Sequence, residues 1–127
     1  MKIQEATQKI NELFPNRYIR IVEQNLIGSV CLAVEFANGD ASTASNNILM
    51  NHSAHMRFLS QPADDTLRGP QALNHPQELE LLTWHYSLRK AGLKFRKINA
   101  KNSEEALDKL VKWFTKNQDL ILQCSAL

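Results

Sequence analysis

The stretch STASNNILMNHSAH, residues 42–55, contains the histidines whose spacing is closest to that of a metal or acid–base site, His52 and His55. It holds two histidines, three asparagines and four hydroxyl side chains, without a Lys, Arg, Asp or Glu. The i, i+3 spacing would place both imidazoles on one side of a helical turn, but on opposite faces of a strand. Because Asn, Ser and Thr side chains bond to nearby backbone groups in turns, we expect a structured crossover between two strands.

A histidine- or metal-dependent hydrolase that uses His52 and His55 is one of three functional hypotheses. Such a site needs a further ligand, and the HExxH pattern of helical zinc sites is missing. The sequence also contains no GxSxG, GxGxxG or GxxxxGK motif. It therefore favours a non-enzymatic protein without a cofactor or metal. The candidates for a third ligand are His75, His85, Asp64 and Asp65.

The strongest functional signal is the segment RKAGLKFRKINAK, residues 89–101, which has six Lys or Arg and no acid. Cations aligned in this way neutralise phosphates and release counterions, which is the main source of non-specific affinity for nucleic acids. A solvated surface is the alternative, because cations stabilise a helix C-terminus and lysines protect an edge strand. The predicted polyanion-binding residues are Arg89, Lys90, Lys94, Arg96, Lys97 and Lys101.

Hydrophobic periodicity predicts the elements that position these residues. Apolar positions repeat with helical spacing over 2–14 and again over 103–117, where Ser103 is the expected N-cap. A further helix over 76–91 is predicted from Pro76 in its first turn, from two cations in its last turn and from Gly92 beyond. Alternating or β-branched patterns predict strands over 17–24, 29–37, 54–61 and 93–98, and residues 62–75 read as a long exposed loop.

The resulting order, α-β-β-β-α-β-α, predicts an α+β two-layer sandwich with a mainly antiparallel four-stranded sheet and helices on one face. Residues 1–127 are expected to form a single globular domain. The tail after residue 118 has two open interpretations, a short edge strand or a cover for the core. An edge strand over 119–124 would offer a homodimer contact.

The α-β-β-β-α order of the first 91 residues resembles double-stranded-RNA-binding domains in topology. Those domains carry a lysine cluster at the start of their second helix, where this sequence reads PQELELL and is acidic. Membership of that family is therefore not predicted.

Composition limits the function further. With 127 residues and no run of 18 apolar residues, the chain is not expected to span a membrane. Its N-terminus lacks the apolar core of a secretory signal, and its two cysteines are expected to be reduced, so we predict a cytoplasmic protein. The leading hypothesis is a small binding protein that acts through a protein partner or nucleoprotein complex, such as a phage or mobile-element accessory protein or inhibitor. Nucleic-acid binding by residues 89–101 is the first alternative.

Overall fold

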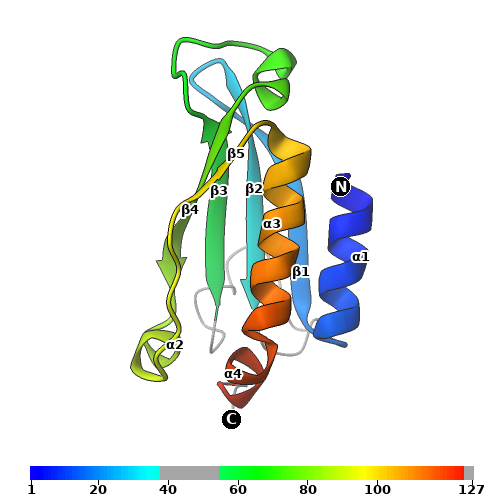
Figure 1. Cartoon of the computed structure of the whole chain (residues 1–127), viewed down its shortest axis with the longest axis vertical. Helices are drawn as coiled ribbons and strands as arrows, with labels where there is room; N and C mark the ends of the chain where they lie inside the picture. Colours follow the sequence, from blue (N-terminus) through cyan, green and yellow to red (C-terminus); the bar gives the residue numbers. More distant parts are fainter. Residues whose placement is uncertain (38–54, 125–127) are drawn as a thin grey trace.

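The computed structural model describes residues 1–37 and 55–124. Five strands form one antiparallel sheet in the order β1-β2-β3-β4-β5, and the two long helices, α1 and α3, lie against one face of it (Figure 1). The predicted α+β class with helices on one face is confirmed, although the sheet has one strand more than predicted. The elements are α1 (Ile3–Leu13), β1 (Tyr18–Leu26), β2 (Ser29–Ala37), β3 (Met56–Pro62), η3 (Pro70–Asn74), β4 (Gln77–Trp84), α2 (Tyr86–Lys90), β5 (Ile98–Ala100), α3 (Ser103–Lys116) and α4 (Gln118–Gln123).

The first hairpin agrees with the prediction from alternating residues. β1 and β2 pair from Tyr18↔Ala37 to Leu26↔Ser29, which leaves a two-residue turn at Ile27 and Gly28. Both turn residues have positive φ, 52° and 81°, as a type I′ turn requires. The predicted third strand is also confirmed, since Met56 and Phe58 are buried and Arg57 is exposed.

The predicted helix over 76–91 is wrong. Its first part is β4, and only Tyr86–Lys90 is helical. Leucine and glutamate are good helix formers, which favours a helix locally, but Leu79 and Leu81 also alternate with Glu78 and Glu80. Pairing of β4 with β3 satisfies the backbone and buries Leu79, so the tertiary context overrides the local preference. Among the described residues β4 precedes α2, so their order differs from the α-β-β-β-α order of double-stranded-RNA-binding domains.

The predicted strand over 93–98 is also largely wrong, because β5 begins at Ile98. Before β5 the chain runs along α3, where the Trp113 indole Nε1–H donates to the Lys94 carbonyl at 3.1 Å. The Trp113 side chain thus bonds to the Lys94 carbonyl, which in a strand would pair with the backbone of a neighbouring strand.

The structure also differs from three smaller predictions, which concern the N-cap of α3, the tail and the 62–75 loop. The N-cap of α3 is Asn102 rather than Ser103, since the Asn102 Oδ1 accepts from the Glu105 backbone N–H at 2.9 Å. The tail forms α4, and buried Ile121 packs into the core, so 119–124 is not an edge strand. The 62–75 segment contains η3, whose Ala72 is buried and accepts a hydrogen bond from the Gln77 side chain at 2.7 Å.

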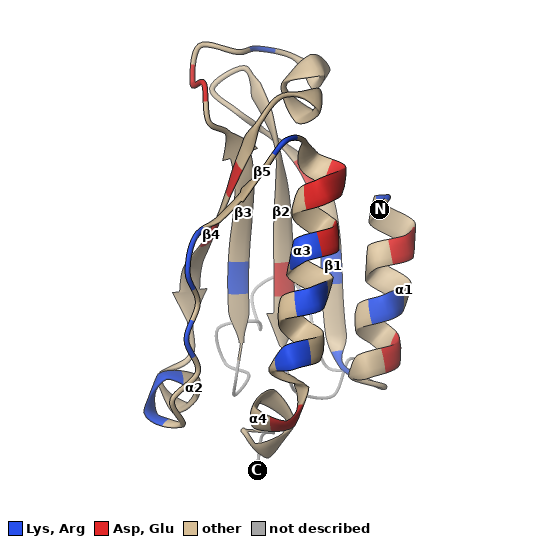
Figure 2. Ribbon diagram, in the orientation of Figure 1, with Lys and Arg blue, Asp and Glu red and all other residues tan. Residues whose placement is uncertain are grey.

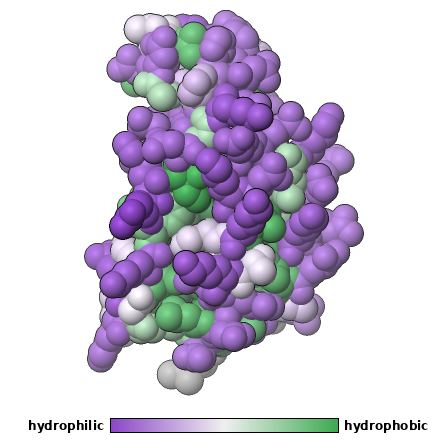
Figure 3. All heavy atoms as spheres, in the orientation of Figure 1, coloured by the Kyte–Doolittle hydropathy of each residue, from purple (hydrophilic) through white to green (hydrophobic). Residues whose placement is uncertain are grey.

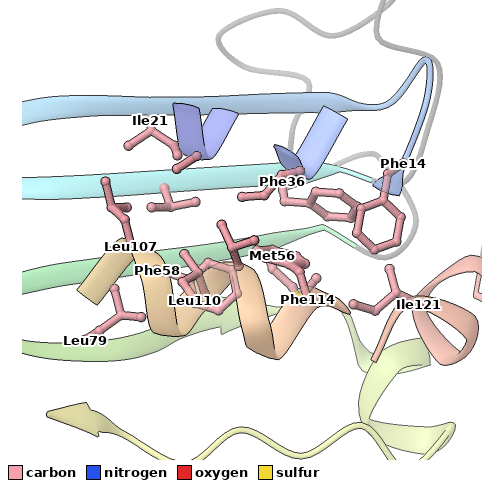
Figure 4. Close-up of a cluster of buried hydrophobic side chains, with 14 of the residues drawn as sticks. Phe14, Ile21, Phe36, Met56, Phe58, Leu79, Leu107, Leu110, Phe114 and Ile121 are labelled. Atoms are coloured by element: carbon pink, nitrogen blue, oxygen red, sulfur yellow. The ribbon is translucent and has the colours of Figure 1, made fainter. Parts of the chain in front are cut away.

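A single cluster of apolar side chains fills the space between the sheet and the two long helices (Figure 4). The Phe114 ring on α3 lies 5.3 to 5.8 Å from the rings of Phe14, Phe36 and Phe58. These four rings are at most 2% exposed. The core thus fixes α3 on the sheet and determines which side of α3 faces solvent. Within the described residues, no helix has the length and apolar character needed to cross a membrane.

Candidate functional site

The six predicted polyanion-binding residues all lie on the surface, but they divide into two groups. Three of them already have partners. The Arg89 guanidinium lies 5.3 Å above the Trp84 ring and donates to the Trp84 carbonyl. Lys97 pairs with Glu78 at 3.5 Å, and Lys101 pairs with Glu105 at 3.8 Å.

The other three predicted residues, Lys90, Lys94 and Arg96, are exposed. Among the described residues, no acid pairs with any of them. Lys90 ends α2, whereas Lys94 and Arg96 belong to the extended segment that precedes β5 (Figure 2). Lys90, Lys94 and Arg96 are therefore available for a new partner.

A second row of cations lies on α3 and was missed by the sequence analysis. Lys109, Lys112 and Lys116 follow one another at i, i+3 and i+7, which places them on one stripe of the helix. The stripe spans about 10 Å along the helix axis at 1.5 Å per residue. It faces solvent because the opposite side of α3, with Leu107, Leu110 and Phe114, is buried. The repeat of lysines opposite this apolar face was the signal in the sequence that could have revealed it.

Three contacts hold the two rows next to each other. The Trp113 indole donates to the Lys94 carbonyl, and its ring lies 5.2 Å from that of Phe95. The Lys109 ammonium donates to the Asn99 carbonyl at 2.7 Å. We call Lys94, Arg96, Lys109, Lys112 and Lys116 the basic surface. Figure 2 shows its two rows on neighbouring segments, and Figure 3 shows that this side of the molecule is mostly hydrophilic with small apolar patches.

One carboxylate interrupts the basic residues of α3. Glu105 accepts from the Lys101 backbone N–H at 3.2 Å and pairs with Lys109 at 3.4 Å. The Lys101 N–H, followed by Lys109, lowers the pKa of this carboxyl. Glu105 therefore stays ionised in mildly acidic solution and partly neutralises the N-terminal end of the stripe. Lys112 and Lys116, further along α3, form no ion pair with an acid among the described residues.

Of the two histidines in the hydrolase hypothesis, only His55 lies within the described residues. His52 and most of the 42–55 stretch lie outside the described residues. His55 is 5% exposed, and its ring lies 5.5 Å from that of His85. His85 caps α2, since its Nδ1 accepts from the Ser87 backbone N–H at 3.2 Å. Across residues 1–37 and 55–124, no three His, Cys, Asp or Glu side chains lie close enough to hold a metal ion.

Asp64, another candidate for a third ligand, serves local structure. Asp64 closes a turn, because its Oδ1 accepts from the backbone N–H and the hydroxyl of Thr66 at 3.0 and 2.6 Å. The Thr66 hydroxyl and then its backbone N–H lower the pKa of the Asp64 carboxyl. This carboxylate is thus a turn acceptor.

A groove of about 520 Å³ lies at the other end of α3 from Lys116. Its apolar lining comes from the starts of α1 and α3, from β2 and from η3, and includes Ile3, Leu32, Leu73 and Leu107. Glu23 and Glu104 also border this groove, whereas none of the five basic-surface residues does. The groove and the basic surface are separate features.

Comparisons with protein-family models, with curated proteins and with solved structures found no match. The assignment of a function therefore rests on the residues and their arrangement.

Proposed function

We propose that this protein is a non-enzymatic binding protein whose basic surface contacts the phosphate backbone of a nucleic acid. The observation that carries the proposal is the position of two cation rows on neighbouring segments, joined through Trp113 and Lys109. Phosphate contacts from several Lys and Arg side chains supply most of the non-specific affinity for nucleic acids. Lys109 can keep its bond to the Asn99 carbonyl while its partly exposed ion pair with Glu105 is exchanged for a phosphate, which costs little.

From the sequence alone a protein partner ranks first, and an acidic protein is the second candidate for the basic surface. The arrangement of the cations favours nucleic acid. Lys109, Lys112 and Lys116 form a regular row, which suits a regular row of phosphates, while the adjacent Trp113 and Phe95 are only partly buried. The hydrolase hypothesis stays a prediction, because His52 lies outside the described residues.

We also propose that the protein works in the cytoplasm. Both cysteines within the described residues are free, Cys31 inside the sheet and Cys124 at the end of α4. Burial raises the pKa of both thiols, which keeps them protonated and slow to oxidise. Free thiols are typical of reducing compartments.

The test is fluorescence anisotropy with labelled single-stranded RNA, duplex RNA and duplex DNA over a range of salt concentrations. If all five basic-surface residues contact phosphates, log affinity for duplex DNA should fall against log salt with a slope of about −4.5. The slope for a single strand should be about −3.5. Absence of binding to all three probes at low salt would reject the proposal and move the acidic protein to first place.

A charge-reversed variant locates the contact. Lys112→Glu with Lys116→Glu removes two contacts, so the slope for duplex DNA should weaken to about −2.7. The matched control is Lys2→Glu with Lys9→Glu, which makes the same charge change at exposed positions on the α1 side of the molecule. If the control weakens binding as much as the α3 variant, the interaction depends on net charge and not on the basic surface.

A further inference from the structure

The face of the sheet opposite α1 and α3 carries a patch of small and apolar side chains. The strand register places Val22, Ala33 and Leu59 side by side on β1, β2 and β3, and Glu80 of β4 ends this row. Leu82 lies in the bulge of β4 and is 56% exposed. The central part of this face forms a shallow hollow of about 190 Å³, which Ala33, Leu59 and Leu82 help to line. We call these four residues the open-face patch.

Two opposite charges border the patch on the central strands. Glu35 on β2 is paired in register with Arg57 on β3, and their side chains form an ion pair at 3.3 Å. The Tyr18 hydroxyl donates to the other carboxylate oxygen of Glu35 at 3.3 Å. The Arg57 side chain is 47% exposed, whereas that of Glu35 is 19% exposed. A second partner can therefore still approach this pair from the open side.

The central pair, Glu35 and Arg57, is complementary to itself under a two-fold rotation. An axis parallel to the strands and midway between β2 and β3 exchanges the positions of these two strands in the facing copy. Glu35 then faces Arg57 of the second copy, and Arg57 faces Glu35 of the second copy. The same rotation sets Ala33 against Leu59 of the second copy, a small residue against a large one. Strand directions stay nearly aligned, as in common sheet-on-sheet packing.

We propose that this open face binds a second copy of the chain, giving a back-to-back dimer with two-fold symmetry. The occupant follows from the charges, because each ionic group of the central pair meets its opposite in the symmetric partner. The proposal uses the face opposite the helices and does not depend on nucleic-acid binding. At 4.8 Å between strands and 3.3 Å per residue, the patch and the adjoining Glu35–Arg57 pair cover roughly 20 by 10 Å, which is small for a stable interface. The dimer should therefore form reversibly with rising concentration.

Sedimentation equilibrium over micromolar to submillimolar protein measures the association. The wild-type mass should rise toward twice the monomer mass. Leu82→Arg should weaken the association at least tenfold, because it places a cation within the patch. The matched control is Ile27→Arg, which changes a 93% exposed apolar residue at the hairpin tip outside the patch and should leave association unchanged.

A charge swap tests the symmetry itself. Arg57→Glu places like charges opposite each other and should weaken association at least tenfold, whereas Glu35→Arg with Arg57→Glu restores both the internal and the intermolecular pairs. Circular dichroism checks that each variant is folded, and the swap keeps the test valid if the single change is unstable. A monomeric wild type at every concentration overturns the proposal. So does a dimer that tolerates both Leu82→Arg and Arg57→Glu in folded proteins.

Discussion

The hairpin turn between β1 and β2 provides a sharp test of the physical reasoning. Ile27 has φ of 52° and is 93% exposed. A β-branched side chain crowds the backbone in this left-handed region, while the exposed Ile27 gains almost nothing from burial. Type I′ turns prefer Asn before Gly, and Gly28 already occupies the second position. Ile27→Asn should therefore stabilise the protein.

The expected gain follows from the backbone cost. The left-handed conformation costs an ordinary residue about 1–2 kcal/mol, and Asn avoids part of that cost through local hydrogen bonds, which gives a gain of about 1 kcal/mol. For a chain of this size the melting temperature should rise by about 3–5 °C. Ile27→Gly should give a smaller gain, because glycine has more entropy to lose on folding.

Thermal and urea denaturation followed by circular dichroism measure these changes. Ile27→Val is the matched control, since valine keeps the β-branch and should leave the midpoint nearly unchanged. A melting temperature for Ile27→Asn that equals or falls below that of the wild type would refute the strain argument. An unchanged urea m-value would show that the difference comes from stability and not from a change in exposed surface.

Three further predictions test the fold around the basic surface. Phe114→Ala should cost about 3–5 kcal/mol in unfolding free energy, because its fully buried ring contacts three other phenylalanines, and urea denaturation measures the loss. Asn102→Ala should cost about 1 kcal/mol as a lost N-cap, whereas Ser103→Ala should change stability by less than about half of that; equal losses in thermal melts would contradict the cap assignment. Glu105→Gln should reduce stability at neutral pH. The Glu105 pKa is lower in the folded chain than in the unfolded chain, so its contribution is present above the unfolded pKa, about 4.3, and disappears as pH falls through the folded pKa. The wild-type and Glu105→Gln melting temperatures should thus converge in acid, and a constant gap would contradict this origin.

The basic surface was half predictable. The run of cations before β5 is continuous in sequence, so Lys94 and Arg96 could be recognised without a structure. The lysines of α3 are separated by apolar core residues, so they do not form a continuous run of cations in the sequence. The contact between Trp113 and Lys94 joins the two rows across 19 positions of the chain, a distance that no local pattern can predict.

The sequence by itself determined the elements whose local preference and final environment agree. α1 and α3 have one apolar face each, β1 to β3 alternate, and these patterns led to an α+β fold with an antiparallel sheet. Only the tertiary structure decided the stretch 77–84, where good helix formers are paired as β4 between β3 and β5. The pattern of Leu and Glu there suits either a helix face or a strand face. The choice depends on the free edge of β3, whose unpaired backbone groups need a partner.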